Sequence, residues 1–154
     1  VTRLEQFEQL FKLGIEKVAV NSAAVGNMDL ITQAAKVFGS QSVVVGIDVR
    51  KTLFGRHERY VKSASEGTKE SAVDAARRAE QAGAGELMLY SVERDGTMQG
   101  YDVPLVRDVA SAVRIPVIAC GGAGSVDRGR IEPAASGAPP PSRPPRMSPN
   151  WLLV

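Results

Sequence analysis

The sequence predicts an α/β fold in which short apolar strands alternate with amphipathic helices around a parallel sheet. Three apolar runs that end in polar residues are typical of buried strands: 17–21, 42–48 and 86–91. Between these runs, apolar residues recur at helical spacing, and glycines such as Gly39 and Gly83 follow the helical stretches. Parallel strands need crossover connections, so this alternation indicates a sheet covered by helices.

Capping patterns define where the other helices are expected to begin. Thr2 and Ser71 each stand three residues before an acidic residue and predict helix starts, with the second helix running to Ala82. Asp102, two residues before Pro104, predicts another start. The chain therefore alternates strand and helix at least three times.

Repeated strand and helix units favour a (β/α)8 barrel, although a doubly wound sheet fits the same alternation. Residues 14–22 and 83–91 share the spacing of a glycine, an apolar strand and a closing serine, which is a weak internal repeat. A further strand is expected at 116–120, and the charged stretch 50–67 is expected to be a long loop or a small hairpin. These repeated units predict a single barrel-type domain over residues 1–125.

Amino-acid composition limits which partners and which cellular compartment we expect for this chain. Of 154 residues, 44% are hydrophobic, and 19 basic residues nearly balance 17 acidic ones, so neither a nucleic acid nor a membrane surface is predicted as a partner. A single cysteine allows no internal disulfide and suggests no metal cluster, and with no apolar run of ~20 residues we expect a cytoplasmic protein. The Pro-rich tail, 126–154, buries too little apolar surface to fold and is expected to be disordered.

Polar and glycine residues follow each predicted strand, where a barrel places its active site. Glycines and small polar residues at such turns let backbone N–H groups approach a phosphate, so two phosphate cradles are candidates, with ordinary glycine turns as the alternative. The candidate cradles begin at Asn21-Ser22 and at Gly121-Gly122, and Asp95-Gly96 stands in the turn after the third run, where an Asp-Gly pair is also ordinary turn chemistry.

Asp48 is the candidate catalytic residue because it ends an otherwise apolar strand. A buried carboxylate is costly unless it is paired or functional, and the alternative role is an ion pair with Arg50 or Lys51. His57 lies in the charged stretch and is expected to be solvated. Cys120 follows an apolar run without a histidine partner, so we expect a packing residue rather than a nucleophile.

Several longer motifs carry a resemblance to a known family. These segments are Val18 to Val25, Phe38 to Val45, Ile47-Asp48, Gly83 to Glu86, Ser91 to Asp102 and Ile115 to Ser125. Through them, the sequence resembles the cyclase subunit of imidazole glycerol phosphate synthase, a barrel of histidine biosynthesis, over about 10–125.

The resemblance implies that the chain holds about the fourth to seventh strands of the barrel. It assigns acid–base catalysis to Asp48, as ammonia from a glutaminase partner adds to a bisphosphate substrate and the imidazole ring closes. By the same resemblance, Asn21 and Ser22 contact one phosphate of the substrate, and Asp95, Gly96, Gly121 and Gly122 surround the other. No cofactor or metal is implied.

The sequence departs from the family pattern in several places, and these departures lead to alternative hypotheses for its function. The family's other catalytic aspartate, on its first strand, has no counterpart here, and the Pro-rich tail replaces the last strand, as a frameshift would explain. We therefore expect this chain to be inactive alone and to self-associate through the apolar surfaces of a half-barrel. Residues 51–55 resemble a paralogous branch of acetamidino-sugar synthesis for surface polysaccharides, and a non-catalytic phosphate-binding remnant is the third hypothesis.

Overall fold

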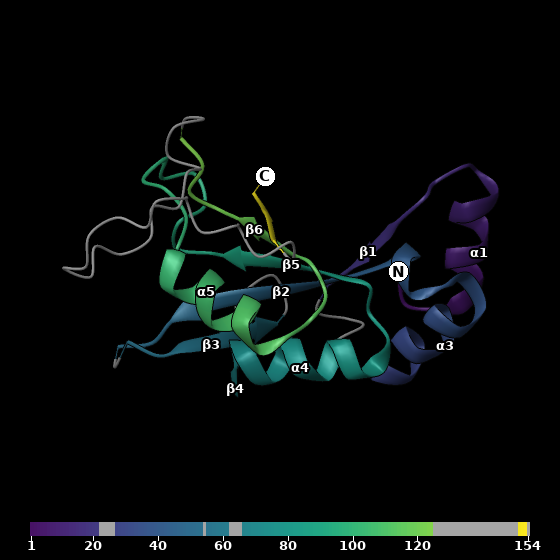
Figure 1. The fold of residues 1–154 in the computed structure, drawn as a ribbon, viewed down its shortest axis with the longest axis horizontal. Helices are drawn as coiled ribbons and strands as arrows, with labels where there is room; N and C mark the ends of the chain where they lie inside the picture. Colours follow the sequence, from purple (N-terminus) through teal and green to yellow (C-terminus); the bar gives the residue numbers. More distant parts are fainter. Residues whose placement is uncertain (22–26, 54, 62–65, 125–150, 154) are drawn as a thin grey trace, which may run out of the picture.

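The computed structural model describes residues 1–21, 27–53, 55–61, 66–124 and 151–153 as an α/β structure (Figure 1). Its elements are α1 (Leu4–Lys12), β1 (Val18–Val20), α3 (Met28–Phe38), the 3-10 turn η1 (Ser40–Ser42), β2 (Val43–Lys51), β3 (His57–Val61), β4 (Glu66–Ser71), α4 (Ala72–Ala82), β5 (Glu86–Ser91), α5 (Val103–Ala112), β6 (Val117–Cys120) and β7 (Trp151–Leu153). Among these, no helix has the length and apolar character needed to cross a membrane.

The parallel strands lie side by side in chain order. β1 pairs with the first part of β2, β2 with β5, and β5 with β6, all in parallel. A doubly wound sheet would reverse its strand order at a switch point, whereas a barrel keeps neighbouring strands in sequence. The prediction of part of a (β/α)8 barrel is therefore confirmed.

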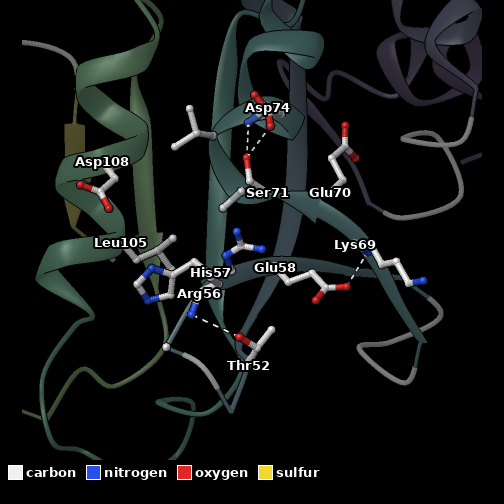
Figure 2. A pocket seen from close by; sticks show the side chains of 13 residues that line it. Thr52, Arg56, His57, Glu58, Lys69, Glu70, Ser71, Asp74, Leu105 and Asp108 are labelled. Atoms are coloured by element: carbon white, nitrogen blue, oxygen red, sulfur yellow. Dashed lines mark hydrogen bonds between the residues drawn. The ribbon is translucent and has the colours of Figure 1, made fainter.

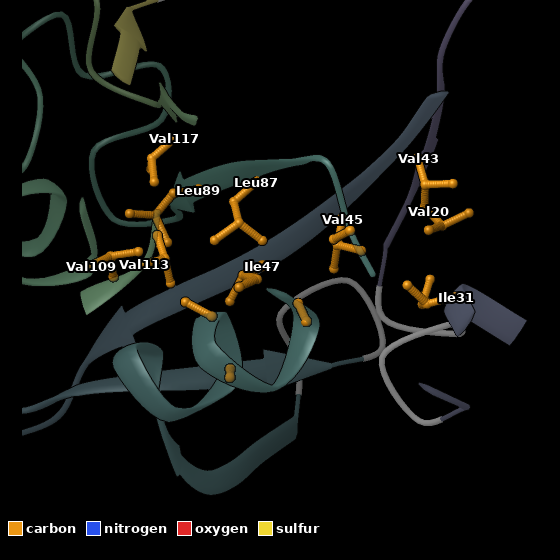
Figure 3. Packing of buried hydrophobic residues seen from close by; sticks show 14 of the residues in the cluster. Val20, Ile31, Val43, Val45, Ile47, Leu87, Leu89, Val109, Val113 and Val117 are labelled. Carbon is orange, nitrogen blue, oxygen red and sulfur yellow. The ribbon is translucent and has the colours of Figure 1, made fainter. Parts of the chain in front are cut away.

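One face of this sheet packs against the helices. Alternate residues of the strands, among them Ile47 and Leu89, join α3, α4 and α5 in a continuous buried cluster (Figure 3). Their neighbours Met88 and Ile118 are only partly buried and lie outside that cluster. Because side chains alternate along a strand, the second face is a separate surface of the sheet.

The charged stretch 50–67 forms the hairpin that was one of its two predicted forms. β2 runs three residues beyond the predicted strand end, because its last part pairs antiparallel with β3, and β3 pairs with β4. The chain then enters α4 at the predicted cap, where the Ser71 hydroxyl accepts from the Asp74 N–H at 3.0 Å. The hairpin thus extends the sheet beside the carboxyl end of β2.

An aromatic cluster fastens the first helix to the third. Phe7 is fully buried, and its ring stacks on that of Phe38 at a centroid distance of 6.2 Å, while Phe11 lies 4.8 Å from Phe38. The predicted cap at Thr2 is wrong: the helix begins at Leu4, and the Gln6 side chain accepts from the Thr2 N–H at 2.7 Å. A glutamine reaching back satisfies the helix start equally well.

The end of the chain differs from the expectation of a disordered tail at the three tail residues that the structure describes. Trp151–Leu153 form β7, which pairs in parallel with β6. The sequence did not predict this strand because three residues are too short for a periodic pattern. An open strand edge offers unpaired backbone groups, so a short apolar segment can pair there. The rest of the predicted tail lies outside the described residues.

Candidate functional site

Asn21 and Asp48 meet at the carboxyl ends of β1 and β2. The Asn21 side-chain Nδ2 donates to the Asp48 carboxylate, 3.1 Å from Oδ1 and 3.3 Å from Oδ2. Asp48 is only 8% exposed, and within the described chain it forms no ion pair with Arg50 or Lys51. The bonded amide therefore fixes the orientation of this carboxylate.

The close approach of these two residues depends on a residue without a side chain. Gly46 lies two residues before Asp48 on the same face of β2, and a Cβ there would stand 3.3 Å from the Asn21 Cγ. Gly46 thus leaves room for the Asn21 side chain to lie across β2 toward Asp48. Ser22, the other residue predicted for this phosphate, lies outside the described residues.

The second predicted cradle is assembled from two loops. The turn after β5 is closed by the N–H groups of Arg94 and Asp95, which both donate to the Ser91 carbonyl, at 3.0 and 3.2 Å. It is tied to the end of β6, where the Gly100 N–H donates to the Gly122 carbonyl at 2.7 Å. The predicted residues Asp95 and Gly96 are exposed on this turn.

Two consecutive glycines make this contact sterically feasible. Gly121 and Gly122 have φ values of +92° and +95°, and a Cβ on Gly121 would lie 2.6 Å from the Ser91 carbonyl oxygen and 3.4 Å from the Asp95 nitrogen. Positive φ and close backbone approach both favour glycine. The structure therefore brings Asp95 and the glycine pair together, in the grouping that the family resemblance implied.

The Asn21–Asp48 pair and the contact between the Asp95 turn and the glycine pair lie at the ends of strands that neighbour each other in the sheet. The cross-strand register aligns Asp48 with Tyr90 and Tyr90 with Cys120, which directly precedes Gly121. With strands ~4.8 Å apart, Asp48 and Cys120 are separated by roughly 10 Å. This spacing suits a small molecule that reaches from one cradle to the other.

Tyr90 is the residue of this region that the sequence argument missed. Burial, followed by interactions with the Cys120 thiol and the carboxylates of Asp95 and Asp48, raises the pKa of its phenol. Burial also raises the pKa of Cys120, against a hydrogen bond from Tyr90 that lowers it. Both groups are therefore protonated at neutral pH. The sequence offered one clue to Tyr90: it directly follows the buried Leu89 in an alternating strand, so its side chain points to the other face of the sheet.

His57 is not solvated, so that expectation was wrong. Its Nε2 lies 3.0 Å from the Asp102 carboxylate, and both side chains are largely buried, with exposed fractions of 15% for His57 and 13% for Asp102. The other Asp102 oxygen accepts from the Leu105 N–H at 3.2 Å and caps α5. The histidine thus links the start of the β3–β4 hairpin to the helix that follows the Asp95 turn.

A pocket of about 740 Å³ opens next to this histidine, between the hairpin and the helices α4 and α5 (Figure 2). Thr52, Arg56, Lys69 and Asp108 contribute mixed charge and hydroxyl groups to its walls. None of the described candidate residues lines it. Within the described ranges, no group of three or more acidic, histidine or cysteine side chains is arranged to hold a metal ion.

Comparison with known proteins matches residues 1–129 to the family model described as "Histidine biosynthesis protein". The chain is 49% identical over 126 residues to the imidazole glycerol phosphate synthase subunit HisF of Alkaliphilus metalliredigens, covering 82% of this chain and 50% of that protein. It is 51% identical over 138 residues to the HisF subunit of Pyrobaculum aerophilum, covering 90% and 54%. The chain thus spans about half the length of these relatives, and it belongs to the histidine biosynthesis protein family.

Proposed function

We propose that this chain is the part of an imidazole glycerol phosphate synthase cyclase subunit that carries one catalytic carboxylate and two phosphate cradles. In the proposed reaction, ammonia from a glutaminase partner adds to a bisphosphate substrate, and the imidazole ring closes. The observation that carries the proposal is the Asn21–Asp48 hydrogen bond at the strand ends, two strands from the glycine pair. The names of the HisF relatives support the same pathway.

Asp48 is suited to moving protons in such a reaction. An ionised carboxylate only accepts hydrogen bonds, and one amide donor leaves most of its lone pairs available to a substrate proton. Asn21 holds the carboxylate in place while it accepts a proton and returns it. The proposed role of Asp48 is therefore general acid–base catalysis, and that of Asn21 is positioning together with contact to one phosphate.

Phosphate is expected to stabilise the folded chain if the cradles bind it. At ten times the dissociation constant, selective binding to the folded state adds about 1.4 kcal/mol, enough to raise the melting temperature by a few degrees. Calorimetric melting in phosphate should show this rise, and potassium chloride of equal ionic strength should not. Equal melting temperatures in the two salts would contradict phosphate binding.

A hybrid barrel tests the proposed activity directly. The 126 matched residues of the A. metalliredigens subunit would be replaced by their counterparts from this chain and expressed in a bacterium that lacks its own cyclase subunit. Growth without histidine is the expected result. A hybrid that folds but does not support growth, beside a parent subunit that does, would overturn the proposal.

The sugar-pathway branch and the non-catalytic remnant are the alternatives that the same hybrid separates. Residues 51–55 motivate the first, and the described part of this segment includes Leu53, which is fully exposed between β2 and β3. A hybrid that binds the cyclase ligand but turns nothing over would favour the remnant. A hybrid that does not bind that ligand would favour the sugar branch.

Self-association of the chain stays a prediction, based on its exposed apolar side chains. Leu13 is 79% exposed and Val37 60%, and the second face of the sheet presents Met88 and Ile118, both partly buried. Burying such surface between two copies releases water and stabilises a dimer. Sedimentation should show dimers or larger species at micromolar concentration, and a well-folded monomer would contradict the prediction.

A further inference from the structure

Four polar side chains form a row across the face of the sheet that does not pack against the helices. The register aligns Tyr60 with Asp48, Asp48 with Tyr90, and Tyr90 with Cys120. Directly aligned residues of paired strands point to the same face. The neighbours of this row along the strands, Ile47 and Leu89, belong to the helix-packed cluster, so the row lies on the opposite face.

Tyr90 occupies the centre of this row. Asp48 stands on one side of it, and Cys120, followed by the glycine pair, on the other, each about 5 Å away at ordinary strand spacing. The phenol is close enough to both Asp48 and Asp95 for their charges to act on it. A molecule that reaches from the Asn21–Asp48 pair to the Asp95 turn therefore passes over Tyr90.

The chemistry of this position is that of a neutral hydrogen-bond donor. The raised pKa of the phenol keeps it protonated at neutral pH, and the Cys120 sulfur lies close enough to act on it. Sulfur is a weak acceptor compared with oxygen or nitrogen, so a ligand atom of either kind would take the phenolic hydrogen in its place. Neither Asp48 nor Asp95 can supply such a donor when ionised.

We propose that Tyr90 is a ligand-binding residue, whose hydroxyl donates a hydrogen bond to an uncharged oxygen or nitrogen in the middle of a ligand that reaches from one cradle to the other, with a phosphate in at least one of them. This inference rests on the proposed function and adds a selectivity element to it. Ligands that lack a central acceptor leave the donor unsatisfied and bind more weakly.

The single cysteine of the chain provides the measurement. In the full 154-residue chain, the rate at which a chromogenic disulfide reagent modifies Cys120 reports occupancy beside Tyr90. Imidazole glycerol phosphate should slow this reaction more than inorganic phosphate does, because only the former has a central acceptor. Equal rates with and without imidazole glycerol phosphate would overturn both the proposed function and this inference.

Tyr90→Phe isolates the hydroxyl. We expect about a tenfold loss of affinity for imidazole glycerol phosphate, the usual effect of one hydrogen bond, and unchanged affinity for inorganic phosphate. Tyr101→Phe is the matched control, because Tyr101 packs against the helix-side cluster, and its affinities should stay unchanged. Circular dichroism would verify that each variant folds.

The outcomes separate the inference from the function on which it rests. Equal affinity of the wild-type chain and Tyr90→Phe for imidazole glycerol phosphate would overturn the role of Tyr90 and leave the proposed function standing. Equal weakening of both ligands in Tyr90→Phe would also overturn it, since that result indicates a structural role. If Tyr90→Phe does not fold, the wild-type comparison of the two ligands decides.

Discussion

Replacing Gly122 by alanine is expected to lower the free energy of unfolding by about 3–5 kcal/mol, through backbone strain and a steric clash together. The added Cβ would lie 2.2 Å from the Gly100 carbonyl oxygen and 2.9 Å from its carbon. Both atoms belong to the backbone, so no side-chain rotation relieves the contact. The 2.7 Å hydrogen bond from the Gly100 N–H to the Gly122 carbonyl would be lost as well.

Gly96→Ala is the control that separates strain from steric clash. Gly96 has a φ of +72°, yet no atom lies within 4 Å of the position of its Cβ. Only the backbone strain remains, so the expected loss is about 1–2 kcal/mol. Urea unfolding of both variants checks the prediction. Equal losses would mean that the turn moves freely away from β6 and that the second cradle is not a fixed structure.

The Asp48→Asn change is expected to reduce turnover by about 10²- to 10⁴-fold, the usual contribution of a positioned general acid or base. The amide keeps the size of the carboxylate and can still accept the hydrogen bond from Asn21, so the fold should survive. It does not accept protons at neutral pH. The measurement is turnover of the hybrid barrel with ammonium salts and substrate, beside the melting temperature of the same variant.

Asp108→Asn is the matched control for this experiment. Asp108 is an exposed carboxylate on α5, away from Asn21 and the glycine pair, and its replacement should leave turnover unchanged. Full turnover in Asp48→Asn would remove Asp48 from the proposed chemistry. A parallel loss in both variants would point to a general effect of charge.

The strands were predictable because burial shows in the sequence as uninterrupted apolar runs. The run before Asp48 and the run before Ser91 marked β2 and β5, and the Ser71 cap marked the start of α4. The hairpin was left open between two forms, because β3 and β4 are polar and carry no alternating apolar pattern. Their pairing depends on the neighbouring edge of β2, which local sequence does not reveal.

The sequence did not predict which polar residues would contact each other across long stretches of the chain. His57 was expected in water because its neighbours are charged, but folding places Asp102, 45 residues away, beside it. The Asp48 carboxylate was expected either to pair with a nearby cation or to be functional, and its described partner is Asn21 from another strand. Both hydrogen bonds join segments that are distant in the chain, so local sequence patterns do not reveal them.

The sequence by itself determined the order of the parallel strands β1, β2, β5 and β6, the helices between them and the polar strand ends, because these follow from local patterns of burial and turn formation. Only the tertiary structure decided which strand ends meet. The parallel register aligned Asp48, Tyr90 and Cys120 on one face, and two glycines with positive φ allowed the Asp95 turn to touch the end of β6. Both depend on contacts between segments that are distant in the chain.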